Sequence, residues 1–243
     1  MAQAKARKKS KSAATAKPAA KKSAKAPAKK AAKKTTAWPQ AFQKLIQKYG
    51  KEPHPLTYSS PYELLVKVVL SAQTNDAFIN KIAPEFLKAY PDFRSIARGS
   101  AEDLYPYLKG VRNFANKSKW LFAIASKLEE SEQIPRTMEA LTELPGIGRK
   151  SASVLLRELG GKGAGVIVDI HVLRVAPRLG ISKQEDAGKM EKEIMAVLPE
   201  SMWADAGMCI SFLGRDVCRP TAPDCGNCVM QKVCEYAARR QPS

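Results

Sequence analysis

The stretch LPGIGRKSASVLL, residues 144–156, separates two segments whose apolar residues recur with helical spacing. Two glycines, Gly146 and Gly148, allow a tight turn in which backbone N–H groups can come close to a ligand. The next helix starts at this turn, so its N-terminal N–H groups and positive dipole end face the same ligand. The segment predicts two helices joined by a hairpin that binds phosphate groups, with Gly146, Gly148 and Arg149 as contacts. An ordinary corner between two helices is the alternative.

Helical spacing also recurs on both sides of this stretch. Phe42, Leu45 and Ile46 predict one helix, and Ser60-Pro61 opens a strongly apolar one. Another is expected around residues 78–87, where Pro84 could kink or split it. Further helices are expected near 101–109, 115–130 and 137–143. Only Val166–Val168 could be a short strand, so we predict an all-α fold of many short helices.

Charge is distributed unevenly along the 243 residues. The net charge is +18, and residues 1–36 hold 13 of the 41 basic residues and none of the 23 acidic ones. These residues offer almost nothing to a hydrophobic core, so residues 1–37 are predicted to be a disordered arm. A basic arm on a modestly basic body indicates a polyanionic partner, nucleic acid before a membrane surface. A solubilising tail or a transit peptide are the alternatives for the arm.

Lys150 and Asp169 are the candidate reactive residues. Lys150 lies where a helix is expected to start, and apolar neighbours there would strip it of solvent and favour its free amine, a nucleophile. Contact with a phosphate is its simpler role. Asp169 stands between Val168 and Ile170, so we expect a half-buried carboxylate at a helix start. Such a carboxylate could stabilise a developing positive charge or accept a proton, and it could also cap the helix.

Four of the five cysteines form a compact pattern, C-x6-C-x2-C-x5-C, made by Cys218, Cys225, Cys228 and Cys234. Four thiolates in such short loops can close one sulfur site. The spacing alone leaves zinc and a [4Fe–4S] cluster open, although structural zinc sites more often pair two CxxC hooks. Cys209 stands in an apolar stretch and is expected to be a core thiol.

The segments LPGIGRKSASVLL and VIVDIHVLRV together resemble the helix-hairpin-helix, loop and Asp of the endonuclease III family of DNA glycosylases. The family has the same cysteine spacing and binds [4Fe–4S] with it, so the resemblance favours the cluster over zinc. It implies that Lys150 is a Schiff-base nucleophile and that Asp169 is essential for base excision. The expected enzyme is a DNA glycosylase and abasic-site lyase that acts on oxidised or ring-saturated pyrimidines in duplex DNA.

The resemblance extends over about residues 40–240 and implies two helical domains. One is expected at 58–168, a six-helix bundle ending with the hairpin, and the other, assembled from 38–57 and 169–243, carries the cluster. Gln73, in the segment LSAQTND, is similar to the family residue that inserts into DNA. The loop between the first two cysteines is expected to dock DNA through Arg219, opposed by Asp224.

A second insertion loop departs from the family pattern. Where the family has Gly, an apolar residue and an aromatic, this chain has Arg112-Asn113-Phe114. Phe114 remains as a DNA contact, but the apolar wedge is missing. We therefore expect slower base excision with abasic-site cleavage retained.

Two other functional classes remain open. A monofunctional mismatch glycosylase of the same superfamily generally lacks the Lys that is present here. A non-enzymatic DNA-binding protein would need neither Lys150 nor Asp169. The expected protein is a monomer without a membrane span, in the bacterial cytosol near the nucleoid, with a nucleus or organelle as the alternatives.

Overall fold

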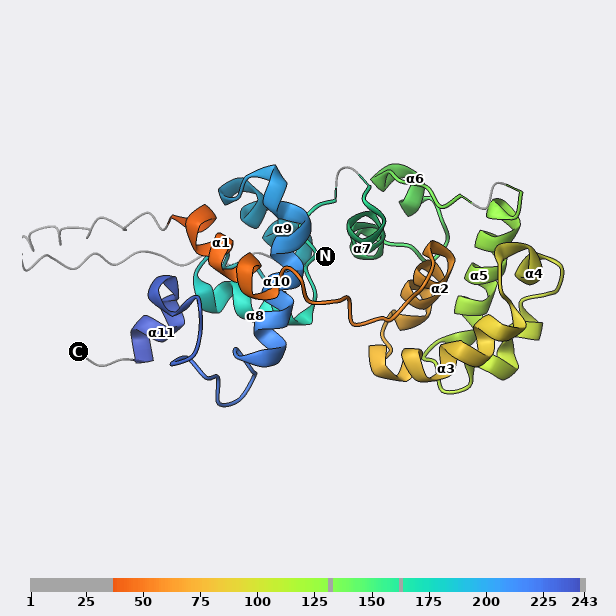
Figure 1. The fold of residues 1–243 in the computed structure, drawn as a ribbon, viewed down its shortest axis with the longest axis horizontal. Helices are drawn as coiled ribbons and strands as arrows, with labels where there is room; N and C mark the ends of the chain where they lie inside the picture. The colour runs from red at the N-terminus through yellow and green to blue at the C-terminus, as the bar shows by residue number, and fades with distance from the viewer. Residues whose placement is uncertain (1–36, 131–132, 162–163, 241–243) are drawn as a thin grey trace, which may run out of the picture. The chain divides into compact units, whose positions relative to one another are not determined.

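A computed structural model describes residues 37–130, 133–161 and 164–240, so the predicted arm lies almost entirely outside the described residues. Every regular element in the described part of the chain is helical, which confirms the all-α prediction. The helices are shown in Figure 1. In chain order they are α1 (Trp38–Tyr49), α2 (Pro61–Ser71), α3 (Asp76–Ala89), α4 (Phe93–Ala97), η1 (Glu102–Leu108), α5 (Phe114–Leu128), α6 (Met138–Thr142), α7 (Arg149–Leu159), α8 (Ile170–Leu179), α9 (Ala187–Val197), η2 (Glu200–Met202), α10 (Trp203–Asp216), η3 (Gln231–Val233) and α11 (Glu235–Arg240).

Short polar side chains start many of these helices by accepting hydrogen bonds from free backbone N–H groups. Ser60 accepts from the N–H of Glu63 at the start of α2, and Asn75 accepts from the first turn of α3. Pro84 lies inside α3, which runs unbroken from Asp76 to Ala89. The helix therefore absorbs the proline without splitting.

The segment Val166–Val168 is extended but forms no strand in the described structure. It runs against α10, where Gly207 lets the two backbones meet. A Cβ atom at Gly207 would lie 2.2 Å from the carbonyl oxygen of Ile167. Packing against a helix thus takes the place of pairing with a second strand, and the segment leads directly into Asp169 and α8.

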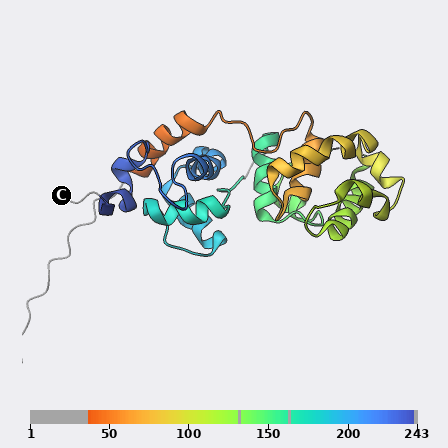
Figure 2. The same cartoon turned by 90° about the horizontal axis from the view of Figure 1, so that it is seen from below.

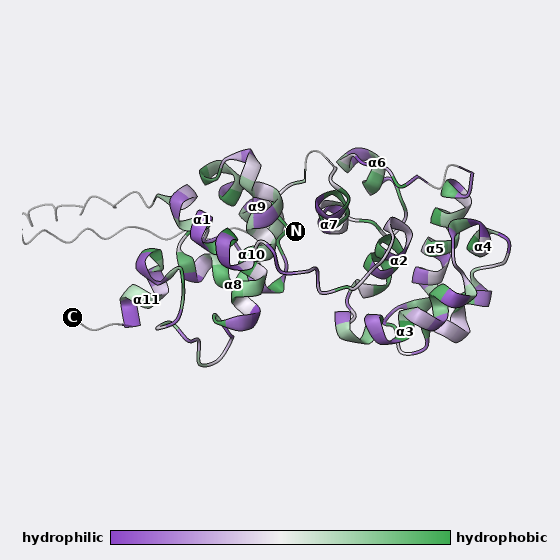
Figure 3. Ribbon diagram, in the orientation of Figure 1, coloured by the Kyte–Doolittle hydropathy of each residue, from purple (hydrophilic) through white to green (hydrophobic). Residues whose placement is uncertain are grey.

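Apolar side chains form two clusters. The hydropathy colouring of Figure 3 shows apolar segments (green) on the helices. The first cluster joins α2–α7, and Leu64, Phe86 and Leu155 are among its fully buried members. The second joins α1 with α8–α11, and Phe42 and Ile210 are among its fully buried members. In Figure 2 α8 (cyan) lies beside α10 (blue), and these two helices are in direct contact. Burial of these apolar side chains away from water favours the packing of each group of helices.

Candidate active site

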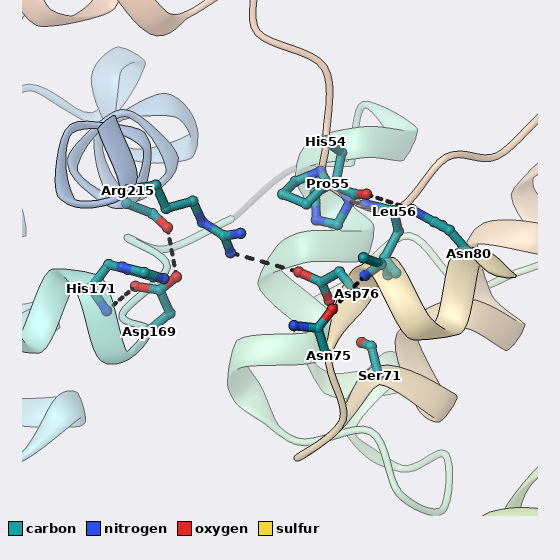
Figure 4. Close-up of polar contacts among 12 residues, drawn as sticks. His54, Pro55, Leu56, Ser71, Asn75, Asp76, Asn80, Asp169, His171 and Arg215 are labelled. Carbon is teal, nitrogen blue, oxygen red and sulfur yellow. Dashed lines mark hydrogen bonds and ion pairs between the residues drawn. The ribbon is translucent and has the colours of Figure 1, made fainter. Parts of the chain in front are cut away.

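One open pocket brings the main predicted residues together. It encloses about 1900 Å³ of space without protein atoms, part of it open to solvent, and Gln73, Lys150 and Asp169 all line it. His54 and Arg215 line the same pocket, and Figure 4 shows them together with Asp169. Residues far apart in the chain therefore converge on one cavity, as an active site requires.

Asp169 is a half-buried helix cap, as the sequence predicts. Its Oδ1 accepts hydrogen bonds from the backbone N–H groups of His171 and Val172, at 2.8 and 2.9 Å. Its Oδ2 accepts a 2.6 Å hydrogen bond from the hydroxyl of Ser211 on α10. These three donors fix the direction of the carboxylate beside the pocket. Ser211 gives no sequence signal for this role, because it stands inside an apolar helix.

Lys150 is the second residue of α7 and its side chain is exposed. The expectation that apolar neighbours strip this amine of solvent is therefore wrong for the protein alone. The amine instead stands in the open pocket, at the positive end of the α7 dipole. Bound DNA would be needed to remove water from it.

The hairpin joins α6 to α7 through the predicted glycines. Gly146 has a φ of +79°, and a Cβ there would lie 2.4 Å from the Trp120 ring. This position therefore requires glycine for both conformation and space. Gly148 caps α7 in an extended conformation, and a Cβ there would meet nothing within 4 Å. The backbone before α7 is thus open to an approaching group.

Arg149 already has a partner. Its Nε and Nη2 donate to the two carboxylate oxygens of Glu191 on α9, at 2.7 and 2.9 Å. Glu191 is 5 % exposed, so this bidentate pair is partly shielded from water. The sequence predicts Arg149 as a DNA contact, whereas its guanidinium here joins the hairpin to α9.

His171 lines the same pocket as the two candidate reactive residues. Burial lowers its pKa, and the nearby cations Arg215, Arg174 and Lys150 lower it further against the opposing effect of Asp169. The Arg174 guanidinium lies 3.2 Å from Nδ1 and can only donate, so Nδ1 accepts and Nε2 carries the proton. His171 is therefore a neutral donor near neutral pH.

Arg215 crosses the pocket to Asp76. Its Nη2 lies 3.6 Å from Oδ2 of Asp76, the first residue of α3, as Figure 4 shows. Arg215 is on α10, so the pair connects a helix of the second apolar cluster with a helix of the first. Both side chains are part-exposed, which limits the strength of the pair. The sequence gives no indication of this contact.

Gln73 occupies a strained turn beside the pocket. The N–H of Thr74 donates to the carbonyl of Ser71 at 2.9 Å, with Ala72 at φ −54° and ψ 116° and Gln73 at φ 57°. These values define a type II turn, whose third position favours glycine. An exposed glutamine at this position costs backbone energy without gaining a buried contact.

The predicted second insertion loop is also exposed. Asn113 has a φ of 58°, a left-handed conformation that asparagine tolerates better than most residues. Phe114 starts α5, is 38 % exposed, and packs edge-on against Tyr105 with ring centroids 5.1 Å apart. The loop therefore presents a polar residue at its tip and an aromatic ring behind it.

The four cysteines line one mostly apolar cavity that encloses about 310 Å³. Arg178 binds the start of the cysteine loop through two hydrogen bonds. Its Nη1 donates to Sγ of Cys218 at 3.4 Å and to the carbonyl of Arg219 at 2.8 Å. A cavity lined by four thiols beside a cation fits a multi-atom iron–sulfur cluster. Among the described residues no group of three or more His, Cys, Asp or Glu is arranged to hold a metal ion.

The cysteine loop presents little charge. Arg219 is exposed, and Asp224 accepts from the backbone and side chain of Asn227, at 3.4 and 2.8 Å. Asp224 is thus held within its own turn. Cys209, the fifth cysteine, is fully buried in the second apolar cluster, and burial raises its pKa to about 12. It is the core thiol that the sequence predicts.

Comparison with known proteins gives one consistent result. The family model described as HhH-GPD superfamily base excision DNA repair protein matches residues 66–200. The chain is 36% identical to endonuclease III of Synechocystis over 75% of this chain and 84% of that protein. It is 32% identical to endonuclease III of Haemophilus influenzae over 76% of this chain and 90% of that protein. The chain belongs to the endonuclease III family.

Solved structures of this family agree. The fold matches a non-covalent endonuclease III–DNA complex with a TM-score of 0.72 and 28% identity, over 83% of this chain and 95% of that one. A trapped endonuclease III–DNA covalent intermediate matches with a TM-score of 0.73 at the same identity and coverage. This endonuclease III family member is therefore a base excision repair enzyme of the DNA glycosylase and abasic-site lyase class, and it binds DNA. The family binds a [4Fe–4S] cluster. No described helix is long and apolar enough to cross a bilayer.

Proposed function

We propose that the protein removes oxidised or ring-saturated pyrimidines from duplex DNA and then cleaves the strand, with Lys150 as nucleophile and Asp169 as its partner. The observation that carries this proposal is the single pocket lined by Lys150, Asp169 and Gln73. A nucleophile, a fixed carboxylate and a residue able to fill the gap in the helix are the three parts that excision of an extruded base needs. A related endonuclease III has been trapped as a covalent intermediate with DNA.

The steps start from the free amine of Lys150. Its Nζ attacks C1′ of the damaged nucleotide, the bond from C1′ to the base breaks, and the base leaves with its electron pair and gains a proton. Opening of the sugar gives a Schiff base between Nζ and C1′. Loss of a C2′ proton then expels the 3′ phosphate by β-elimination, and water releases the amine.

Asp169 acts through charge and position. Positive charge develops at C1′ as the base departs, and a carboxylate held in place stabilises it without having to reorganise. Three hydrogen bonds, from two backbone N–H groups and Ser211, hold Asp169 in this position. The same carboxylate can accept a proton from Lys150.

The residues that would hold a [4Fe–4S] cluster are Cys218, Cys225, Cys228 and Cys234, which line one cavity. Bound there, the cluster would supply a covalent cross-link between the turns of residues 218–234. Arg178 would position the first ligand and the carbonyls of the loop. Replacement of Cys228 by Ser should lower the iron content and the visible absorbance of the purified protein, whereas replacement of the buried Cys209 should not.

The remaining parts of the proposal concern the partner and the organisation of the chain. The partner is double-stranded DNA with a damaged base or an abasic site, bound by a monomer near the bacterial nucleoid. Residues 58–168 form one domain, and 38–57 with 169–243 form the cluster domain. The basic arm of residues 1–37 tethers DNA and supplements the weakly charged loop at Arg219.

The test is borohydride trapping on a duplex with one abasic site, using cluster-loaded wild type and Lys150→Ala. We expect a covalent protein–DNA adduct with wild type and none with the variant, because only an amine forms a reducible Schiff base. An unchanged adduct in Lys150→Ala would assign the nucleophile elsewhere. No adduct from wild type would remove the lyase step and favour a monofunctional glycosylase.

A further inference from the structure

Lys117 on α5 is an almost completely buried lysine, 2 % exposed. Its Nζ donates to the carbonyl oxygens of Leu70 and Ala72, at 2.7 and 2.6 Å, and to Oγ1 of Thr74 at 3.2 Å. An ammonium group has three donors, and here three acceptors use them. All three acceptors belong to the last turn of α2 and the residues that follow it.

No carboxylate forms an ion pair with Lys117 in the described part of the chain. Burial, together with a smaller effect of the nearby Arg112, lowers its pKa to about 8. A buried cation without an opposite charge is costly, so a residue that only filled space would be better apolar. The hydrogen bonds to the turn are the feature that requires a lysine here.

The turn held by Lys117 is the strained one that carries Gln73. A left-handed backbone at a residue other than glycine persists only when its surroundings determine it. The carbonyls at the end of α2 also lack partners within their own helix. Lys117 satisfies these carbonyls on one side of Gln73 and holds Thr74 on the other, so it fixes both ends of the turn.

Lys117 also connects this turn with the second exposed loop. The backbone N–H of Arg112 donates to Oγ1 of Thr74 at 3.3 Å, so the same hydroxyl serves both segments. Lys117 lies one turn beyond Asn113, the residue that caps α5. The two loops expected to enter DNA, at 72–74 and at 112–114, therefore meet at the Thr74 hydroxyl, which also accepts from the buried amine.

We propose that Lys117 is a positioning residue for lesion recognition, which holds the Gln73 turn and the Arg112–Phe114 loop in the arrangement that penetrates DNA. This inference rests on the proposed function, in which Gln73 fills the space left by the extruded nucleotide. Lys117 itself is too buried to touch DNA. It acts by setting the conformation in which Gln73 is presented.

The experiment measures discrimination, the ratio of the dissociation constant for an undamaged duplex to that for the same duplex with a tetrahydrofuran abasic-site analogue. Lys117→Met should lower this ratio by about tenfold, the effect of one or two hydrogen bonds. Gln73→Ala should lower it similarly. The double variant should lose less than the two single losses added together, because Lys117 acts mainly through Gln73.

Lys67→Met is the matched control. Lys67 is also a buried lysine, 5 % exposed, and its amine donates to the backbone carbonyl of Thr57, away from the Gln73 turn. Its replacement should reduce stability without changing the ratio. Thr74→Val, which removes only the shared hydroxyl, should lower the ratio by a smaller factor and serves if Lys117→Met does not fold.

The pH dependence of the ratio distinguishes a positioning role of Lys117 from a role in stabilising the fold alone. The wild-type ratio should fall as pH rises through about 8, because the neutral amine of Lys117 has two donors for three acceptors. Among the described residues, Arg112 is the other charged group that acts on this amine, and it keeps its charge over this range. Lys117→Met should show a flat ratio over about one pH unit on either side of that value.

Several results would overturn the inference. An unchanged ratio in Lys117→Met, an additive loss in the double variant, or an equal loss in Lys67→Met would each do so. Borohydride trapping of the same proteins tests the proposed lyase function independently of the role of Lys117. Wild type that forms no adduct contradicts the proposed function, whereas wild type that traps while Lys117→Met discriminates normally contradicts only the role of Lys117.

Discussion

Gln73→Gly should make the protein more stable and lower its affinity for damaged DNA. The turn places position 73 at φ 57°, where a side chain crowds its own backbone and glycine does not. A left-handed conformation costs an L-residue about 1–2 kcal/mol. Part of this is offset because glycine is more flexible in the unfolded chain, which leaves a gain of about 0.5–1 kcal/mol.

The gain in the unfolding midpoint should be about 1–4 °C for a chain of this size, measured by thermal unfolding of the cluster-loaded protein. Affinity for the duplex with the abasic-site analogue should fall by about tenfold, because the amide that can reach the orphaned base is gone. Gln73→Ala is the control, since it removes the same amide and keeps the strained backbone.

Comparison of the two variants separates the effect of backbone strain at position 73 from the effect of losing the amide. Both should lose affinity for the abasic-site duplex equally, and only Gln73→Gly should gain stability. A glycine variant no more stable than the alanine variant would show that the turn is unstrained. A glycine variant with full lesion affinity would show that the side chain of Gln73 does not contribute to recognition.

Three further predictions concern other positions. Asp169→Asn should keep the α8 cap, since Asn is also a good cap, and change the unfolding midpoint little, yet lower single-turnover base excision by on the order of 100-fold; retained excision would limit Asp169 to capping. Between about pH 8 and 10.5 the unfolded chain binds more protons at Lys117 than the folded one does, so stability rises with pH there. In urea unfolding, the difference in the free energy of unfolding between wild type and Lys117→Met should change by up to about 3 kcal/mol over this range. A constant difference would contradict the lowered pKa. Asn113→Leu should speed excision of an oxidised pyrimidine and leave abasic-site cleavage unchanged, at a cost of about 1–2 kcal/mol of stability for a left-handed leucine; an unaltered excision rate would show that no apolar wedge is missing.

The helices and the hairpin could be predicted because their signals are local. Ser60 before Pro61 marks the start of α2, and glycines mark the turn before α7. The half-buried Asp169 at the start of α8 follows from its apolar neighbours in the same way. Spacing alone could not say whether Pro84 would split α3, because that depends on how the whole helix packs.

The contacts of the pocket could not be predicted, because they join distant parts of the chain. Ser211 reads as one polar residue in an apolar helix, yet it holds Asp169. Lys117 reads as one of many lysines in the sequence, and only the structure shows that it is buried and holds the Gln73 turn. Lys150 is exposed, whereas its apolar neighbours in sequence predict a desolvated amine. Neighbours in sequence do not cover a side chain that lines an open pocket.

The pairing of Arg149 with Glu191 also affects how DNA affinity responds to salt. Each phosphate neutralised by a free cation releases condensed counterions and steepens the fall of affinity with salt by about 0.9 in logarithmic slope. A guanidinium already bound to a carboxylate contributes little to this release. We therefore expect the hairpin to bind DNA mainly through uncharged backbone N–H groups, and this contact should persist at ionic strengths that release a lysine-rich arm.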